Sequence, residues 1–295
     1  MGGTPRTHRL LWLCLALSLA LTGGAWAQEQ GPTPSEPDSP PAAAASAEGG
    51  APAGSDLAKQ LSNPVSSLIS VPFQANWDFG VGPEDGERFI LNFQPVMPFS
   101  LGEDWNLIAR VITPIVAQPI LVPGGESSFG LGDIVPTFFL SPKEGSITWG
   151  VGPVFSLPAT SIPTLGSGRW SLGPSAVVLK QVGPWTMGGL VNHVWSVGGD
   201  ADRADVNATF MQPFLAYGTS SGYTFTVNSE MLANWEAADG QEWTVPVNFA
   251  VSKMTMLGRR PIQVQAGVRY FLEKPTGGPS WGIRLGLVLV FPLAP

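Results

Sequence analysis

Large apolar side chains alternate with small or polar residues along most of the chain. The run 280–291 shows this most clearly, with apolar residues at every second position: Trp281, Ile283, Leu285, Leu287, Leu289 and Phe291. Between them lie Gly282, Arg284 and Gly286. A period of two residues is that of a β-strand, whose successive side chains point to opposite faces. The run therefore predicts a strand with one apolar face and one small or polar face.

The same alternation recurs in about twelve segments, each close to the ~9–11 residues that a tilted transmembrane strand needs. Their approximate bounds are 68–79, 87–98, 104–116, 129–140, 146–157, 168–180, 184–196, 204–217, 222–235, 241–252, 261–272 and 280–291. The pattern is least regular near 129–140 and 184–196, so the strand register there is not predicted. After residue 27 no run reaches the ~18 consecutive apolar residues of a transmembrane helix.

The faces opposite the apolar ones carry Asn, Gln, Arg and Asp. In 261–272, for example, Gln263, Gln265 and Arg269 alternate with aliphatic residues. Apolar residues outside and polar residues inside are typical of a membrane-spanning barrel. We therefore predict an all-β fold, a closed antiparallel transmembrane β-barrel of about 12 strands formed by residues 63–295. A soluble β-sandwich or a lipocalin-like barrel is the alternative.

Tryptophan positions favour the membrane barrel. Nine of the 11 Trp follow residue 27, and all nine fall near a predicted strand end. The expected outer rim holds Trp77, Trp170, Trp195, Trp235, Trp243 and Trp281, and the periplasmic rim holds Trp105, Trp149 and Trp185. Aromatic rings with a polar edge prefer the membrane–water interface, so these residues predict two girdles. The connections on the outer side are also slightly longer, except that 252–260 is long on the periplasmic side.

The N-terminus has the features of an export signal. Arg6 and Arg9 precede the apolar run 10–21, and Ala25-Trp26-Ala27 gives a small-x-small cleavage site. We predict a signal peptide over 1–27. Residues 28–62 are mostly Pro, Ala, Gly, Ser and Glu, which predicts a disordered periplasmic linker. Export of a barrel places it in the outer membrane of a Gram-negative bacterium.

Composition excludes several functions. The net charge of −7 gives no electrostatic footprint for nucleic acid. The single cysteine, Cys14, lies inside the predicted signal, so no disulfide, thiolate catalysis or cysteine metal site is expected. We predict no catalytic residue, no metal, no cofactor and no enzyme activity. The alternative is a membrane-embedded lipid-modifying enzyme that pairs His193 with a nearby serine: Ser171, Ser175, Ser196 or Ser229.

Ionisable residues on the predicted inner face are the candidate site. They are Asp78, Arg88, Arg110, Asp133, Glu230, Glu242, Arg269 and Arg284. Charges of both signs inside a barrel can bind or filter a passing solute. They can also pair with one another and plug the lumen, which is the favoured interpretation. The predicted outer loops are acidic, which indicates a solvated rim, a mild cation preference or divalent-ion bridging to lipopolysaccharide.

Several stretches together resemble a family of uncharacterised bacterial outer-membrane β-barrels. The stretches are Leu61–Gln74 (LSNPVSSLISVPFQ), Asn76–Gly80 (NWDFG), Gln94–Phe99 (QPVMPF), Asp104–Ile108 (DWNLI), Trp149–Phe155 (WGVGPVF) and Gly278–Gly282 (GPSWG). Members of that family are labelled transporters, sometimes under the mistaken name neuromedin U. More distantly, the chain is similar to barrels of phenol-degradation pathways (MetA-type). The resemblance implies an outer-membrane barrel and leaves the solute open.

The last strand also resembles the signal that the barrel-insertion machinery recognises, through Arg284, Gly286, Leu289 and Phe291. It departs from that signal in the extra residues 292–295. The expected partners are therefore this machinery, outer-membrane lipid and lipopolysaccharide, and an unknown small solute. We predict a channel or transporter that passes small solutes passively or with weak selectivity. A structural barrel with a plugged lumen and the lipid-modifying enzyme remain alternatives.

Overall fold

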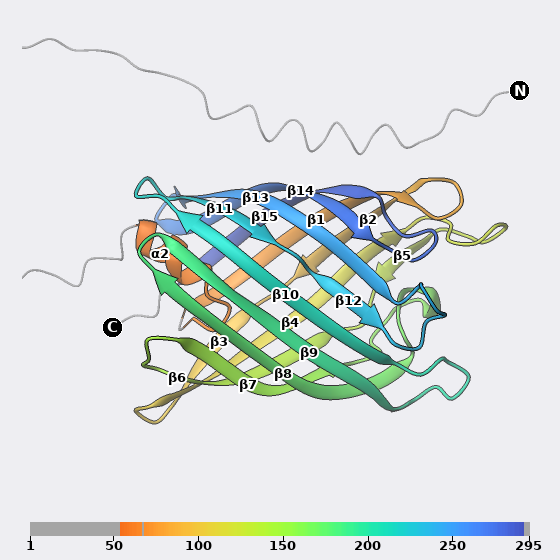
Figure 1. Ribbon diagram of the computed structural model, residues 1–295, viewed down its shortest axis with the longest axis horizontal. Coiled ribbons are helices and arrows are strands. Elements are labelled where there is room, and N and C mark those ends of the chain that lie inside the picture. Colours follow the sequence, from red (N-terminus) through yellow and green to blue (C-terminus); the bar gives the residue numbers. More distant parts are fainter. Residues whose placement is uncertain (1–53, 67, 292–295) are drawn as a thin grey trace, which may run out of the picture. The chain divides into compact units, whose positions relative to one another are not determined.

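The computed structural model describes residues 54–66 and 68–291 of the 295-residue chain (Figure 1). The predicted signal peptide and the first part of the predicted linker lie outside the described residues. The strands are β1 (Ile69–Val81), β2 (Gly86–Phe93), β3 (Val96–Leu101), β4 (Trp105–Gln118), β5 (Ser128–Leu131), β6 (Val135–Pro142), β7 (Thr148–Ser156), β8 (Arg169–Val182), β9 (Trp185–Gly199), β10 (Asn207–Gly218), β11 (Tyr223–Asn228), β12 (Met231–Asn234), β13 (Trp243–Leu257), β14 (Arg260–Glu273) and β15 (Trp281–Phe291). The helices are α2 (Gly54–Leu61) and the 3₁₀ turn η1 (Pro163–Leu165).

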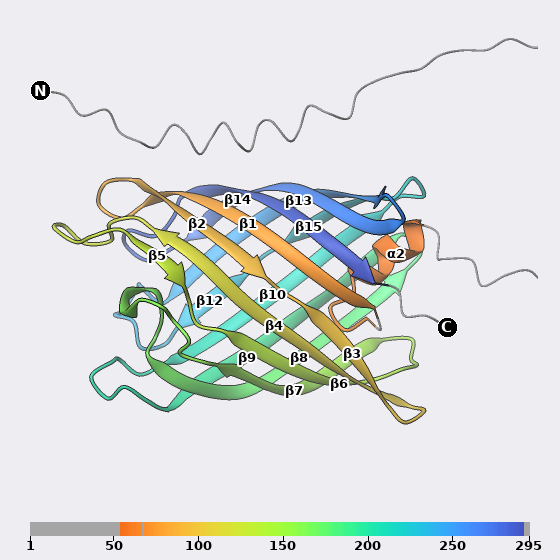
Figure 2. The ribbon, with the colours of Figure 1, turned by 180° about the vertical axis from the view of Figure 1, so that it is seen from behind.

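These strands form one antiparallel sheet that closes on itself. Each strand pairs with its neighbours in sequence, and β15 pairs with β1 from Ile69↔Phe291 to Phe79↔Trp281. Because β2–β3, β5–β6 and β11–β12 are each one interrupted strand, the barrel has twelve strands, as predicted. Figures 1 and 2 show the strands tilted along the barrel on both sides. Closure pairs the first strand with the last, so the sheet as a whole has no open edge, and among the described strands only the short β5 is paired on one side alone.

Two of the three interruptions lie beside prolines, which have no N–H to donate to a ladder. β2 and β3 are separated by Gln94 and Pro95, and Pro95 has no N–H. β11 and β12 are separated by Ser229 and Glu230. Ser229 donates its N–H to Pro213 O and its hydroxyl to Pro246 O, so it lies between two strands that each present a proline.

The second of these interruptions leaves the inward and outward faces unchanged. On one side β10 pairs Phe214 with Asn228 and Phe210 with Leu232, so the register of β11 continues into β12. The pairing with β13 is continuous in the same way. Asn234 therefore keeps the inward side that alternation through 222–235 predicts.

The outer surface is a continuous apolar belt. Its exposed side chains on the last three strands are Phe249, Val251, Val264, Val268, Ile283, Leu285 and Leu287. A soluble protein would not leave so many neighbouring apolar side chains in water, whereas lipid accepts them. The chain is therefore a transmembrane β-barrel of the outer-membrane type. No helix in the described ranges is both long and apolar enough to span a membrane.

The two ends differ in their connections. At the end where β1 begins, the longest connection is 143–147, and at the opposite end it is 157–168, which contains η1. Short turns are typical of the periplasmic side of such barrels, so β1 starts there. The predicted long connection at 252–260 is wrong, because β13 continues to Leu257 and β14 begins at Arg260. The remaining turn, Gly258-Arg259, is tight and has Gly258 at φ 62°.

Helix α2 corrects the predicted linker. Residues 54–61 were expected to be disordered as part of 28–62, but they form a helix at the periplasmic end of the barrel (Figure 1). Leu57 and Ala58 are buried against Met254 and Val290 of the barrel wall. Short helices are not stable alone, and packing of an apolar face supplies the missing stability. Asp56 in the first turn and Lys59 in the last also match the helix dipole.

Candidate functional site

Polar side chains gather inside the barrel on the wall made by β1, β2, β4 and β11–β15. We call them the luminal polar cluster: Asn76, Asp78, Arg88, Gln94, Arg110, Asn228, Glu230, Asn248, Arg269 and Arg284. Six of the eight predicted inner-face residues belong to it. The neutral Asn and Gln members were not singled out from the sequence, because alternation alone does not distinguish them from other inward polar residues.

Asp78 is one anchor of the cluster. Its side chain is 0% exposed and accepts from two guanidinium groups. Arg88 Nη2 lies 3.0 Å from Oδ2, and Arg269 Nη1 lies 2.9 Å from Oδ1. The first of these charge-assisted bonds joins β2 to its neighbour β1, and the second joins β14 to β1 across the seam where β15 meets β1.

Glu230 is the second anchor. Arg284 approaches it with both terminal nitrogens, Nη1 2.8 Å from Oε1 and Nη2 2.6 Å from Oε2. Such a bidentate pair fixes both distance and orientation. Arg269 Nη2 lies 3.8 Å from Oε2 and so connects the two anchors. Glu230 lies on the inner face because alternation continues from Asn228 through the interruption after β11.

Amides complete the network. Arg284 Nε donates to Asn76 Oδ1 at 2.7 Å, and Arg269 Nε donates to Asn248 Oδ1 at 3.2 Å. Asn248 in turn donates to Asn228 Oδ1 at 2.6 Å. Buried charges are tolerated when their remaining hydrogen-bonding atoms are also satisfied, which these amides achieve.

Arg110 differs from the other three arginines. Its Nη2 donates to the neutral Gln94 Oε1 at 2.9 Å, and among the described residues it makes no ion pair. The cluster therefore combines four guanidinium groups with two carboxylates, Asp78 and Glu230, for a net formal charge of +2. Arg88 is 25% exposed and Glu230 is 18% exposed, so solvent reaches part of the cluster.

The opposite wall of the lumen carries a cluster of apolar side chains, with buried Ser and Thr residues among them. The luminal apolar cluster consists of Val65, Ile108, Phe139, Val177, Leu179 and Leu190, with Val96, Phe210 and Phe214 partly buried against it. Val65 comes from the segment after α2, so the N-terminal segment enters the lumen. The interior thus has a charged side and an apolar side.

Two predicted inner-face residues lie outside the cluster. Asp133, between β5 and β6, accepts from the N–H and the hydroxyl of Ser167, both at 2.7 Å. It ties the long connection 157–168 to the barrel. Glu242 lies in the connection before β13, where its carbonyl accepts from Asn234 N–H. No hydrogen bond or ion pair within the described ranges joins either side chain to the polar cluster.

The tryptophans lie near the two ends of the barrel. Trp105 contacts Trp149, and Trp185 contacts Tyr217, at the periplasmic end. At the opposite end the aromatic contacts are Trp77–Phe89, Phe79–Trp281, His193–Trp195 and Trp235–Trp243. Trp170, exposed near the start of β8, lies at the same end. Their placement at the lipid–water boundary remains a prediction.

His193 faces outward. Its neighbours on that face, Val191 and Trp195, are 43% and 48% exposed, whereas the inward Leu190 is 4% exposed. Its Nδ1 lies 2.7 Å from Thr209 Oγ1, and Trp235 Nε1 also donates to this hydroxyl.

The serines considered for an enzyme do not meet the histidine. Ser171 and Ser175 are buried on the inner face, Ser196 donates to Asp205, and Ser229 donates to Pro246 O. The described residues therefore contain no Ser–His hydrogen bond. They also contain no group of three or more His, Cys, Asp or Glu side chains placed to hold a metal ion.

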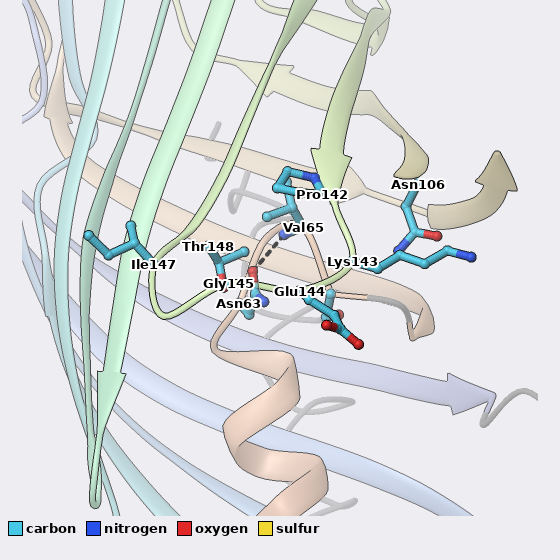
Figure 3. A pocket seen from close by; sticks show the side chains of 10 residues that line it. Asn63, Val65, Asn106, Pro142, Lys143, Glu144, Gly145, Ile147 and Thr148 are labelled. Atoms are coloured by element: carbon cyan, nitrogen blue, oxygen red, sulfur yellow. Dashed lines mark hydrogen bonds between the residues drawn. The ribbon is translucent and has the colours of Figure 1, made fainter. Parts of the chain in front are cut away.

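The periplasmic mouth is narrowed by the N-terminal segment. Figure 3 shows Asn63 and Val65 beside the β6–β7 turn, where Lys143, Glu144 and other residues line a pocket of about 100 Å³. Lys143 is held away from the segment by bonds to Ser100 Oγ and Gly102 O. A second pocket, of about 190 Å³, lies between α2 and the turns after β8 and β10. Gln181 fixes α2 there by donating to Lys59 O at 2.9 Å.

The fold matches known outer-membrane barrels. The COG4313 outer membrane channel from Pseudomonas putida F1 superposes with a TM-score of 0.57 at 17% identity, over 76% of this chain and 94% of that chain. The NanC porin superposes with a TM-score of 0.51 at 11% identity, over 76% of this chain and 100% of that chain. No family model and no curated protein matches the chain. At these identities the likeness establishes the fold.

Proposed function

We propose that the protein is a channel in the outer membrane of a Gram-negative bacterium that passes small solutes passively or with weak selectivity. The observation that carries this proposal is the interior: a closed transmembrane barrel holds charged groups that remain partly accessible to solvent. Accessible charges inside a barrel act on whatever solute enters it. The known barrels of the same fold include a channel and a porin, which supports the same class of function.

Twelve strands give a narrow lumen, between the filled barrels of about eight strands and the open barrels of about sixteen. Both luminal clusters and α2 reduce this space further. Passage is therefore restricted to small molecules. The resemblance to the transporter-labelled outer-membrane family agrees with this proposal, and we extend the proposal to membership of that family. Insertion through the C-terminal strand signal and contact with lipopolysaccharide at the outer rim are part of the same proposal.

We also propose that the protein is not an enzyme. His193 and Thr209 do form a hydrogen-bonded pair on the lipid-facing surface, but a nucleophile activated by histidine also needs a group that orients the base. Nε2 of His193 is buried and has no hydrogen-bond partner among the described residues. The pair therefore lacks the third member of a catalytic arrangement.

The test is the conductance of the purified full chain in a planar bilayer. A gel shift between boiled and unboiled samples first establishes that the barrel is folded. Discrete current steps from folded protein are the expected result. A folded barrel that gives no steps in repeated insertions overturns the channel and favours a structural barrel with a plugged lumen. Phospholipid hydrolysis that depends on His193 would contradict the absence of enzyme activity.

A further inference from the structure

The luminal polar cluster has unused capacity for negative charge. Its net formal charge is +2, and Arg110 has only the neutral Gln94 as a hydrogen-bond partner among the described residues. Nε of Arg88 is buried and likewise has no partner there. Guanidinium groups form their strongest bonds with carboxylates and phosphates, so an anion satisfies groups that the protein leaves incompletely paired.

Arg110 also lies where the charged and apolar walls meet. On one side β4 pairs Arg110 with Val96 of β3, and on the other with Thr137 of β6. Two residues earlier on the same inner face is Ile108, which pairs with Phe139. Val96, Ile108 and Phe139 are all members of the luminal apolar cluster. A solute bound to Arg110 therefore contacts apolar side chains next to its charged group.

The β10 wall extends this apolar surface to the region of Glu230. Phe210 and Phe214 flank the inward Gln212 and are partly exposed. The N–H of Ser229 donates to the carbonyl of Pro213, which precedes Phe214 on β10. This bond places Glu230, the next residue after Ser229, beside the part of β10 that carries Phe210 and Phe214. A short apolar chain or ring fits such a surface better than a small inorganic ion does, because inorganic ions gain nothing from apolar contacts.

We propose that the channel selects amphipathic organic anions, with a carboxylate-like head bound at Arg110 and a short apolar body on the luminal apolar cluster. This inference rests on the proposed channel function. The acidic outer loops do not oppose it. Asp85, Asp200 and Glu236 are solvent-exposed, and water and salt screen such charges within about 8–10 Å. Charges inside the lumen are screened far less, so the arginines dominate selectivity.

The experiment measures ion selectivity and block in planar bilayers. The full chain is compared with Arg110→Gln, which removes the charge, and Arg110→Lys, which keeps it. Arg259→Gln is the matched control, because it removes one arginine from the exposed periplasmic turn. Reversal potentials are recorded in a KCl gradient. Three blockers are then added. Hexanoate has both the apolar chain and the carboxylate, acetate has the carboxylate without the chain, and hexanamide has the chain without the charge.

The wild type and Arg259→Gln are expected to prefer chloride and to be blocked by hexanoate at lower concentration than by acetate or hexanamide. Arg110→Gln should lose most of the chloride preference and need about tenfold more hexanoate for half block, the effect of one lost charge-assisted bond. Arg110→Lys should keep the preference.

Different failures have different meanings. Absence of current steps from folded wild type overturns the channel and this inference with it. Current steps that favour potassium, or equal block of the wild type by all three compounds, leave the channel standing and overturn the anion site. If Arg110→Gln does not fold, the selectivity and the three blockers on the wild type decide the outcome.

Discussion

Arg284 on the closing strand holds both carboxylate oxygens of Glu230, at 2.8 and 2.6 Å, although 54 positions separate the two residues in the chain. The pair therefore forms only after β11–β12 and β15 have taken their places in the closed barrel. It is nearly buried, with Arg284 5% exposed. Removing one member of such a pair leaves an uncompensated charge.

Glu230→Gln should accordingly destabilise the barrel by about 3–5 kcal/mol, the usual cost of breaking a buried ion pair from one side. The measurement is the urea midpoint for unfolding from phospholipid vesicles. Glu236→Gln, in the exposed outer connection, is the control and should leave the midpoint unchanged. The double variant Glu230→Gln/Arg284→Gln should recover part of the loss. Equal midpoints for Glu230→Gln and Glu236→Gln would show that the pair contributes no stability.

Gly282 allows Asp78 to take its position. A Cβ at residue 282 would lie 2.6 Å from Asp78 Oδ1 and 2.6 Å from Trp77 O, and the backbone oxygen cannot move freely. Gly282→Ala should therefore cost about 1–3 kcal/mol in the same unfolding measurement. Gly189→Ala is the matched control within a strand, because the nearest atom to its added Cβ is 3.8 Å away. A larger loss in Gly189→Ala than in Gly282→Ala would contradict the proposed close approach.

Strand periodicity predicts the barrel and its strands, but only part of the luminal polar cluster. Alternation indicates the face of a residue, which is how Asp78 and Arg269 became candidates. Asp78 lies directly opposite Arg88 on the neighbouring strand, but its bond to Arg269 joins β1 to β14, which are not neighbours, and alternation does not contain that relationship. Alternation also places Glu230 inward, but its contacts with Arg269 and Arg284 reach two strands that do not neighbour its own. Helix α2 was missed because its sequence has little apolar surface of its own, and its stability comes from the barrel wall.

The prolines of β7 and β8 predict a weak point in the barrel wall. Pro153 pairs directly with Pro174, and neither has an N–H to donate. The pairing of β8 with β9 also lapses between Leu172↔Trp195 and Ser175↔Asn192. Backbone amides beside these positions should exchange hydrogen at least about tenfold faster than those of β14, because local opening needs fewer broken bonds. Uniform protection along both regions would rule out local opening there.

The contacts of Asp205 should make the outer connection between β9 and β10 sensitive to pH. Hydrogen bonds from Arg169 and Ser196, together with the charge of Arg169, lower the pKa of the Asp205 carboxyl. The pKa of Asp205 is lower in the folded protein than in the unfolded chain. The ionised carboxylate therefore stabilises the connection 200–206 fully at pH values above the ordinary carboxyl pKa, and this stabilisation is lost as the pH falls through the folded pKa. Asp205→Asn should imitate the acidic state at neutral pH and make Arg203 cleavable by trypsin. Asp202→Asn, whose carboxylate is exposed, is the control. Resistance of Asp205→Asn to trypsin would contradict the anchor.

Helix α2 should limit the current through the channel. Leu57 is buried against Met254 and Val290, so Leu57→Asp should release the helix from the wall at a local cost of about 2–5 kcal/mol. The expected result is a larger single-channel conductance with unchanged barrel stability, since the twelve strands do not depend on the helix for their ladders. Asp56→Asn, on the exposed side of the same helix, should keep the wild-type conductance. If Leu57→Asp also conducts as the wild type does, the restriction lies at the luminal clusters, where Arg110 and Ile108 narrow the path from one strand.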